Sequence, residues 1–143
     1  MSTVNYLPWA VLSLVAYSAV PPLVSAATSG EEAVPTIVAV LVSNGILVVV
    51  ALGLLLWSGD SVVASLDHPK FPFIVVAGVF LTVGILAYYR ALALGPVSVV
   101  TPVFATFLVG SAVVGVVFLD EAVTARKALA AAFALVAVYL ASG

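Results

Sequence analysis

The feature that most constrains this chain is the spacing of its charges. Runs of about 20 apolar residues, the length a helix needs to cross a hydrocarbon core of roughly 30 Å, follow one another along the sequence. Charged side chains are confined almost entirely to the short segments between these runs. The pattern therefore predicts an all-α integral membrane protein.

Five apolar runs can be distinguished, and each predicts one transmembrane helix. Their approximate ranges are 7–27, 33–57, 71–90, 96–119 and 126–142. The fifth has an apolar stretch of only about 16 residues from Ala128 onward, about 24 Å at 1.5 Å per residue, which falls short of the core. The start of the chain lacks the basic segment of a signal peptide, so we expect the first helix to be retained. No soluble domain or linker is left over, and we predict one transmembrane domain over residues 1–143.

The composition excludes several other classes of protein. Hydrophobic residues make up 65% of the chain and charged residues 7%, whereas soluble domains average about 45–50% and 25%. Cysteine is absent and there is one histidine, so neither a disulfide framework nor a metal centre is expected. The net charge of −2 gives no reason to expect a nucleic-acid partner. No catalytic triad, phosphate-binding glycine loop or metal-ligand cluster is visible, and we expect neither an enzyme nor a cofactor.

The segment AYYRALALGPVSVVTP, residues 87–102, departs most from the apolar background. A helix that begins at Phe71 rises about 28 Å by Arg90, which places this arginine at the far interface. Two interpretations of Arg90 stay open. It is either an anchor that snorkels to the headgroups beside Tyr88 and Tyr89, or a side chain that faces a water-filled substrate path.

Together with VVFLDEAVTARKALAAAFALVAVYLAS further on, this segment resembles the end of an EamA domain, the repeat unit of the drug/metabolite transporter superfamily. The resemblance covers roughly residues 70–143. The positions that carry it are Tyr88, Arg90, Ala91, Leu92, Gly95, Pro96, Ser98, Pro102 and Glu121. It implies a membrane transporter of a small metabolite.

The chain departs from the family pattern where flexible backbone is common. Leu108 stands where family members often have a proline, and Ala130, Ala131 and Ala137 stand where they often have glycines. We therefore expect the fourth helix to be straighter than in the family.

Most family members resemble two fused EamA domains in inverted orientation, whereas this chain resembles one half. Inverted repeats form their site between the two halves, and alternating access is the rocking of one half against the other. The resemblance therefore implies a homodimer of five-helix repeats, or a heterodimer with a sister repeat, in the cell membrane. Lys70, Arg126 and Lys127 are expected on one side of the bilayer and Arg90 on the other. This bias is small, so we expect both orientations and an antiparallel homodimer, with a parallel homodimer or a heterodimer as the alternatives.

Polar residues inside the predicted spans are the candidate substrate contacts, because each is costly in lipid unless it faces a partner or a cavity. The candidate substrate-binding residues are Asn44, Tyr17, Ser13, Thr82, Tyr89, Arg90, Ser98 and Pro102. Ser13 shares a helix face with Tyr17, Thr82 with Tyr89, and Ser98 with Pro102. An interhelical hydrogen bond is the alternative role for Asn44, and helix packing is the alternative for the small residues of the fourth helix.

The acidic residues constrain the transport mechanism, because proton-coupled exporters usually carry a carboxylate within the membrane. All six are expected in loops: Glu31, Glu32, Asp60, Asp67, Asp120 and Glu121. Facilitated diffusion or exchange is therefore favoured, and Asp120 and Glu121 are expected to pair with Arg126 or Lys127. Two other functions stay open: a non-transporting membrane subunit that supports a partner, and a cation or drug exporter.

Overall fold

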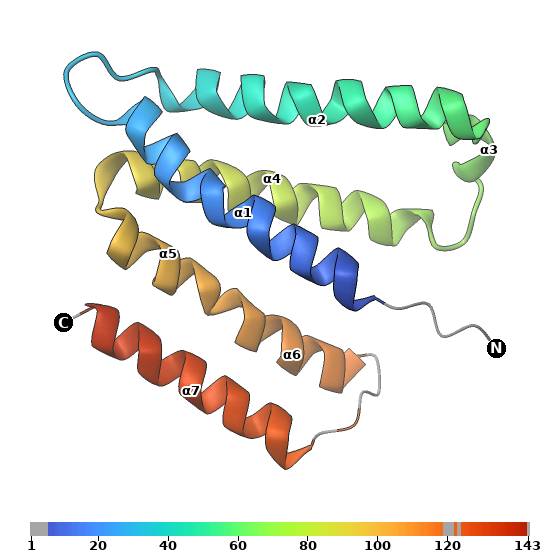
Figure 1. Cartoon of the computed structure of the whole chain (residues 1–143). Helices are drawn as coiled ribbons and strands as arrows, with labels where there is room; N and C mark the ends of the chain where they lie inside the picture. The colour runs from blue at the N-terminus through green and yellow to red at the C-terminus, as the bar shows by residue number, and fades with distance from the viewer. Residues whose placement is uncertain (1–5, 119–121, 123, 143) are drawn as a thin grey trace. The chain divides into compact units, whose positions relative to one another are not determined.

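The computed structural model describes residues 6–118, 122 and 124–142, and it is built from helices (Figure 1). The helices are α1 (Leu7–Thr28), α2 (Thr36–Ser58), α3 (Val62–Ser65), α4 (Phe71–Leu94), α5 (Val97–Ala105), α6 (Phe107–Phe118) and α7 (Ala125–Ser142). Four stretches are long and apolar enough to cross a membrane, namely α1, α2, α4, and α5 continued by α6. Helix α7 adds a shorter apolar stretch, Ala128–Leu140. The predicted all-α membrane fold with about five spans is confirmed.

The spanning helices expose their apolar side chains instead of burying them. Leu56 is 84% exposed and Trp57 is 86% exposed, and the buried hydrophobic residues of the described chain are Tyr89 and Leu92. A soluble protein could not carry so large an apolar surface. In a bilayer, lipid tails or another chain cover it.

Several helix ends differ from the predicted ranges by a few residues. Helix α4 continues past Arg90 to Leu94, and α2 begins at Thr36, after Pro35. Prolines favour the position just before or at a helix start, because their missing N–H would be unpaired there in any case. The short helix α3 was not predicted. Its N-terminus is capped by Ser61, whose Oγ accepts a hydrogen bond from the Ala64 N–H at 3.3 Å.

The fourth span is interrupted at Thr106, contrary to the expectation of a straighter helix. The Thr106 N–H bonds to the Val103 carbonyl at 3.2 Å, one residue short of the α-helical partner. The Thr106 hydroxyl donates to the same carbonyl at 2.6 Å. Hydroxyls that bond back to their own helix often bend it, and Pro102, one turn earlier, has no N–H to support the preceding turn. Replacing a family proline by Leu108 therefore does not make the span regular.

The chain divides into two compact units, which we describe separately. One comprises Met1–Pro22 and Gly95–Gly143, and the other is Leu23–Leu94. In the first, α7 packs against α5 and α6; in the second, α2 packs against α4. The first boundary falls inside α1 directly after Pro21 and Pro22. Two consecutive prolines remove two backbone donors from the helix, which weakens it at this point.

Helix α2 ends on a glycine that the backbone requires. Gly59 has φ +74°, and its N–H bonds to the Leu55 carbonyl at 3.1 Å. A Cβ at this position would meet no atom within 4 Å. Any cost of a side chain here therefore comes from the left-handed backbone alone.

We predict that Gly59→Ala lowers the free energy of unfolding by about 1 kcal/mol, because alanine is disfavoured at positive φ. Gly45→Ala is the matched control, since Gly45 lies inside the same helix and also faces open space. This second change should raise stability by about 0.5–1 kcal/mol. Denaturant titration in detergent micelles measures the free energy of unfolding of both variants. Equal changes in this free energy would contradict the assignment of Gly59 as the C-terminal cap of α2.

Candidate functional site

Most hydroxyls whose hydrogen bonds we describe in the spans bond to the backbone of their own helix. Four of them donate to a carbonyl four residues earlier at 2.7–2.8 Å. The pairs are Ser18 with Leu14, Thr28 with Val24, Ser43 with Ala39, and Thr82 with Gly78. Such bonds satisfy a polar group in lipid without help from another helix. A hydroxyl that also reaches a second helix therefore stands out.

Ser43 is such a residue. Its Oγ lies 3.1 Å from the hydroxyl oxygen of Tyr89, which joins α2 to α4. When the single hydrogen of Ser43 goes to the Ala39 carbonyl at 2.8 Å, the Tyr89 hydroxyl is the donor between the two. Tyr89 is only 4% exposed. This hydrogen bond holds an almost fully buried side chain in one orientation.

An apolar groove of about 440 Å³ lies beside this hydrogen bond, within the unit Leu23–Leu94. It is bordered by the last turns of α1, by Val34, by one face of α2 and by Tyr89. The Val34 N–H bonds to the Ala27 carbonyl at 2.8 Å and closes the connection between α1 and α2. Apart from Ser43 and Tyr89, the lining side chains are apolar: Leu23, Val24, Ala27, Val34, Val38, Ala39, Val42 and Ile46. A groove of this kind suits a small molecule with an apolar body.

Asn44 lies beside this site but not in it. It is about 12 Å from the start of α2 at Thr36, and it is turned about 100° around the helix from Ser43. Its Nδ2 donates to the Val40 carbonyl at 2.9 Å and lies 3.5 Å from Ser43 Oγ. Within the described residues the Asn44 side chain makes no hydrogen bond to another helix. The interhelical hydrogen bond that we considered for Asn44 is thus made by Ser43.

The other sequence candidates are distributed over both units. In the second unit, Thr82 is exposed and its hydroxyl donates to the Gly78 carbonyl. Arg90, next to Tyr89 in the sequence, is also exposed. Among the described residues Arg90 forms no ion pair. In the first unit, Ser13, Tyr17 and Ser98 are exposed and Pro102 is partly buried. Of the predicted set, the structure brings Asn44 and Tyr89 together, through Ser43.

Two hydroxyl residues were missed as candidates in the sequence. Ser43 could have been found, because a tyrosine at a helix interface needs a hydrogen-bond partner and few are present in these spans. The other is Thr101, whose Oγ1 is the one buried side-chain nitrogen or oxygen without a partner in the part of the chain that the structure describes. No sequence signal separates Thr101 from the other hydroxyls.

The acidic residues that the structure describes lie outside the spanning helices. Glu31 and Glu32 are in the turn after α1, and Asp60 and Asp67 lie between α2 and α4. The Ser58 hydroxyl donates to Asp60 Oδ2 at 2.7 Å. Asp120 and Glu121, and with them the predicted pairing to Arg126 or Lys127, lie outside the described residues.

We predict a measurable coupling between Ser43 and Tyr89. In a double-mutant cycle of Ser43→Ala and Tyr89→Phe, the interaction free energy should be roughly 0.6 kcal/mol and at most about 1.7 kcal/mol, as for other hydrogen bonds between membrane helices. Unfolding in detergent measures each variant. Tyr17→Phe with Ser43→Ala is the control cycle, because Tyr17 is 66% exposed. Additive effects in the first cycle would show that the bond contributes nothing.

The comparisons with known proteins extend the resemblance found in the last three spans. The sequence profile described as the EamA-like transporter family matches residues 5–143. Searches of curated proteins and of solved structures found no match. Because the family match covers every apolar helix described above, the chain belongs to the EamA-like transporter family and is an integral membrane protein of the drug/metabolite transporter type.

Proposed function

We propose that this protein moves a small metabolite across the cell membrane by alternating access, as a dimer of five-helix units. The observation that carries the proposal is the groove beside the Ser43–Tyr89 hydrogen bond, which lies among helices of a transporter family. Apolar walls with a few polar groups at one place are typical of sites for small molecules.

The lining of the groove suggests the kind of substrate. No charged side chain lines it, and the two hydroxyls are already bonded to each other. A substrate with an uncharged, mostly apolar body fits these walls, with one polar group near Ser43 and Tyr89. The described acids lie outside the spans, so we favour facilitated diffusion or exchange over coupling to protons.

The second half of the transporter is proposed to be another copy of this chain. In inverted-repeat transporters the substrate site lies between two halves, and each half is one such helical unit. Asn44 is turned away from the groove on α2, and we propose that it faces the cavity shared by the two copies. Arg90, exposed near the end of α4, is proposed to lie at the entrance of that path.

A non-transporting subunit is the second candidate, because alanines replace the family's glycines in α7 and no charge lines the groove. A cation exporter is less well supported, since the described parts of the spans hold no carboxylate. Uptake into proteoliposomes with amino acids, sugars, nucleosides and cationic dyes separates the three. Uptake of an uncharged metabolite supports our proposal, uptake of dyes alone supports the exporter, and uptake of none supports the subunit.

We predict that Val42→Phe reduces transport at least about tenfold, because the larger ring occupies a groove of substrate size. Val48→Phe is the matched control, since Val48 lies on the same helix but does not line the groove, and it should transport normally. Asn44→Leu should also abolish transport, with stability changed by no more than about 1 kcal/mol. Normal transport by both Val42→Phe and Asn44→Leu would rule out both proposed substrate contacts.

We predict that the protein inserts in both orientations, as an antiparallel homodimer requires. The chain has no cysteine, so single cysteines can be introduced at Ser29 and Ser65. Both residues are exposed. Ser29 precedes the spanning helix α2 and Ser65 follows it, so the two sites should face opposite sides of the membrane. In intact cells an impermeant thiol reagent should label about half of each population. Full labelling of one and none of the other would exclude the antiparallel homodimer.

A further inference from the structure

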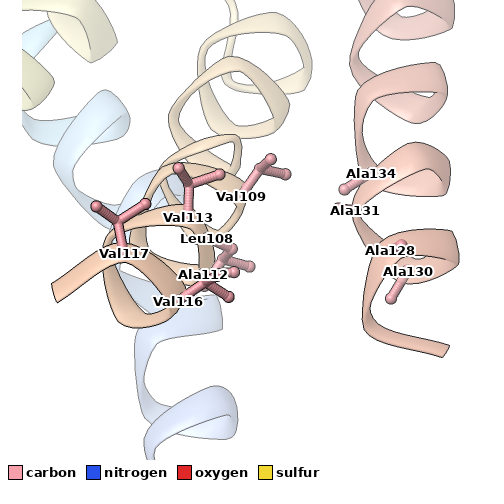
Figure 2. A pocket seen from close by; sticks show the side chains of 10 residues that line it. All are labelled: Leu108, Val109, Ala112, Val113, Val116, Val117, Ala128, Ala130, Ala131 and Ala134. Atoms are coloured by element: carbon pink, nitrogen blue, oxygen red, sulfur yellow. The ribbon is translucent and has the colours of Figure 1, made fainter. Parts of the chain in front are cut away.

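A second groove, separate from the proposed substrate site, lies between α6 and α7 in the other unit. Its volume is about 520 Å³. Figure 2 shows the α6 side chains on one side and four alanines of α7 on the other. The lining residues are Leu108, Val109, Ala112, Val113, Val116, Val117, Ala128, Ala130, Ala131 and Ala134. None of them carries a polar side chain.

The groove follows from two local features of the sequence. The fourth span is interrupted at Thr106, and α7 packs more extensively against α5, before the interruption, than against α6, after it. In addition, α7 presents alanines on this side, which are too short to fill the space opposite the valines of α6. The result is a long apolar depression along two helices.

A basic residue lies one helical turn before Ala130, which lines this groove. Arg126 is exposed in the first turn of α7, which begins at Ala125. Residues four apart lie on one face of a helix, so Arg126, Ala130 and Ala134 form one row, of which the two alanines line the groove. Arg126 precedes the apolar stretch Ala128–Leu140, so in a bilayer we expect the arginine at the membrane surface and the apolar walls inside the hydrocarbon.

We propose that this groove binds one phospholipid with an anionic headgroup. Its acyl chain lies between α6 and α7, and its phosphate contacts Arg126. A polar solute would find no group to orient it in the groove, whereas an acyl chain needs none. A ligand that is apolar along its length and negative at one end matches apolar walls with an arginine one turn beyond them. The planar guanidinium also binds phosphate with two parallel hydrogen bonds.

The pairing of Arg126 with Asp120 or Glu121 expected from the sequence would compete with a lipid phosphate for the same guanidinium group. Asp120 and Glu121 lie outside the described residues. The measured preference for an anionic over a zwitterionic headgroup decides whether Arg126 contacts a lipid phosphate.

Native mass spectrometry of the purified protein, with phosphatidylglycerol or phosphatidylcholine added to the detergent, tests the proposal. The protein should retain one phosphatidylglycerol in preference to phosphatidylcholine. Arg126→Gln should weaken phosphatidylglycerol retention about fivefold, the contribution of one basic side chain near an anionic lipid, and remove the preference. Lys70→Gln is the charge control, since Lys70 is exposed in the other unit.

Filling the groove tests the acyl chain. The double variant Ala130→Leu with Ala134→Leu should lose retention of both lipids, whereas Ala132→Leu should not, because Ala132 does not line the groove. Equal retention of the two lipids by the unaltered protein would overturn the proposal. Equal lipid retention by the Ala130→Leu/Ala134→Leu double variant and by the Ala132→Leu control would also overturn the proposal. Efficient cross-linking of two chains through Val113→Cys in membranes would show that a second copy, and not a lipid, occupies the groove.

Discussion

The structure depends on one constraint: in hydrocarbon every backbone N–H and C=O must find its partner within the protein. Continuous helices meet this requirement segment by segment, which explains why the apolar segments are helical. The same constraint governs the hydroxyls of Ser18, Thr28 and Thr82, which donate to their own helices. Three prolines interrupt this pairing inside the helices, because Pro21, Pro22 and Pro102 lack a backbone N–H.

These prolines lie next to two breaks in the helical structure. The unit boundary in α1 follows Pro22, and the interruption of the fourth span follows Pro102 by one turn. Each of the two grooves lies within one of the units. Most of the spanning surface is apolar and exposed, so specific recognition rests on few groups. The Ser43–Tyr89 hydrogen bond is the interhelical contact between side-chain polar groups that we describe, and it borders the proposed substrate groove.

Much of the fold could be predicted from the sequence because hydropathy and charge spacing reflect bilayer thickness directly. The approximate positions of the spans and the loop positions of Glu31, Glu32, Asp60 and Asp67 follow from this relation. The interruption at Thr106 could not be predicted from Leu108, because it arises from the Thr106 hydroxyl and from Pro102. Ser43 was overlooked in favour of Asn44 because an amide is the more costly group in lipid, yet the amide bonds to its own helix. Which of two adjacent polar residues reaches a neighbouring helix depends on helix rotation, and an apolar sequence with weak amphipathicity does not define that rotation.

We propose that transport needs two copies of the chain. Mixing unaltered protein with an inactive variant such as Asn44→Leu before reconstitution tests it most directly. If two functional copies are needed, a half-and-half mixture should retain about one quarter of the transport rate, because only dimers of two unaltered chains are active. A rate of about one half, proportional to the unaltered chain, would mean that each copy transports alone and would contradict the account.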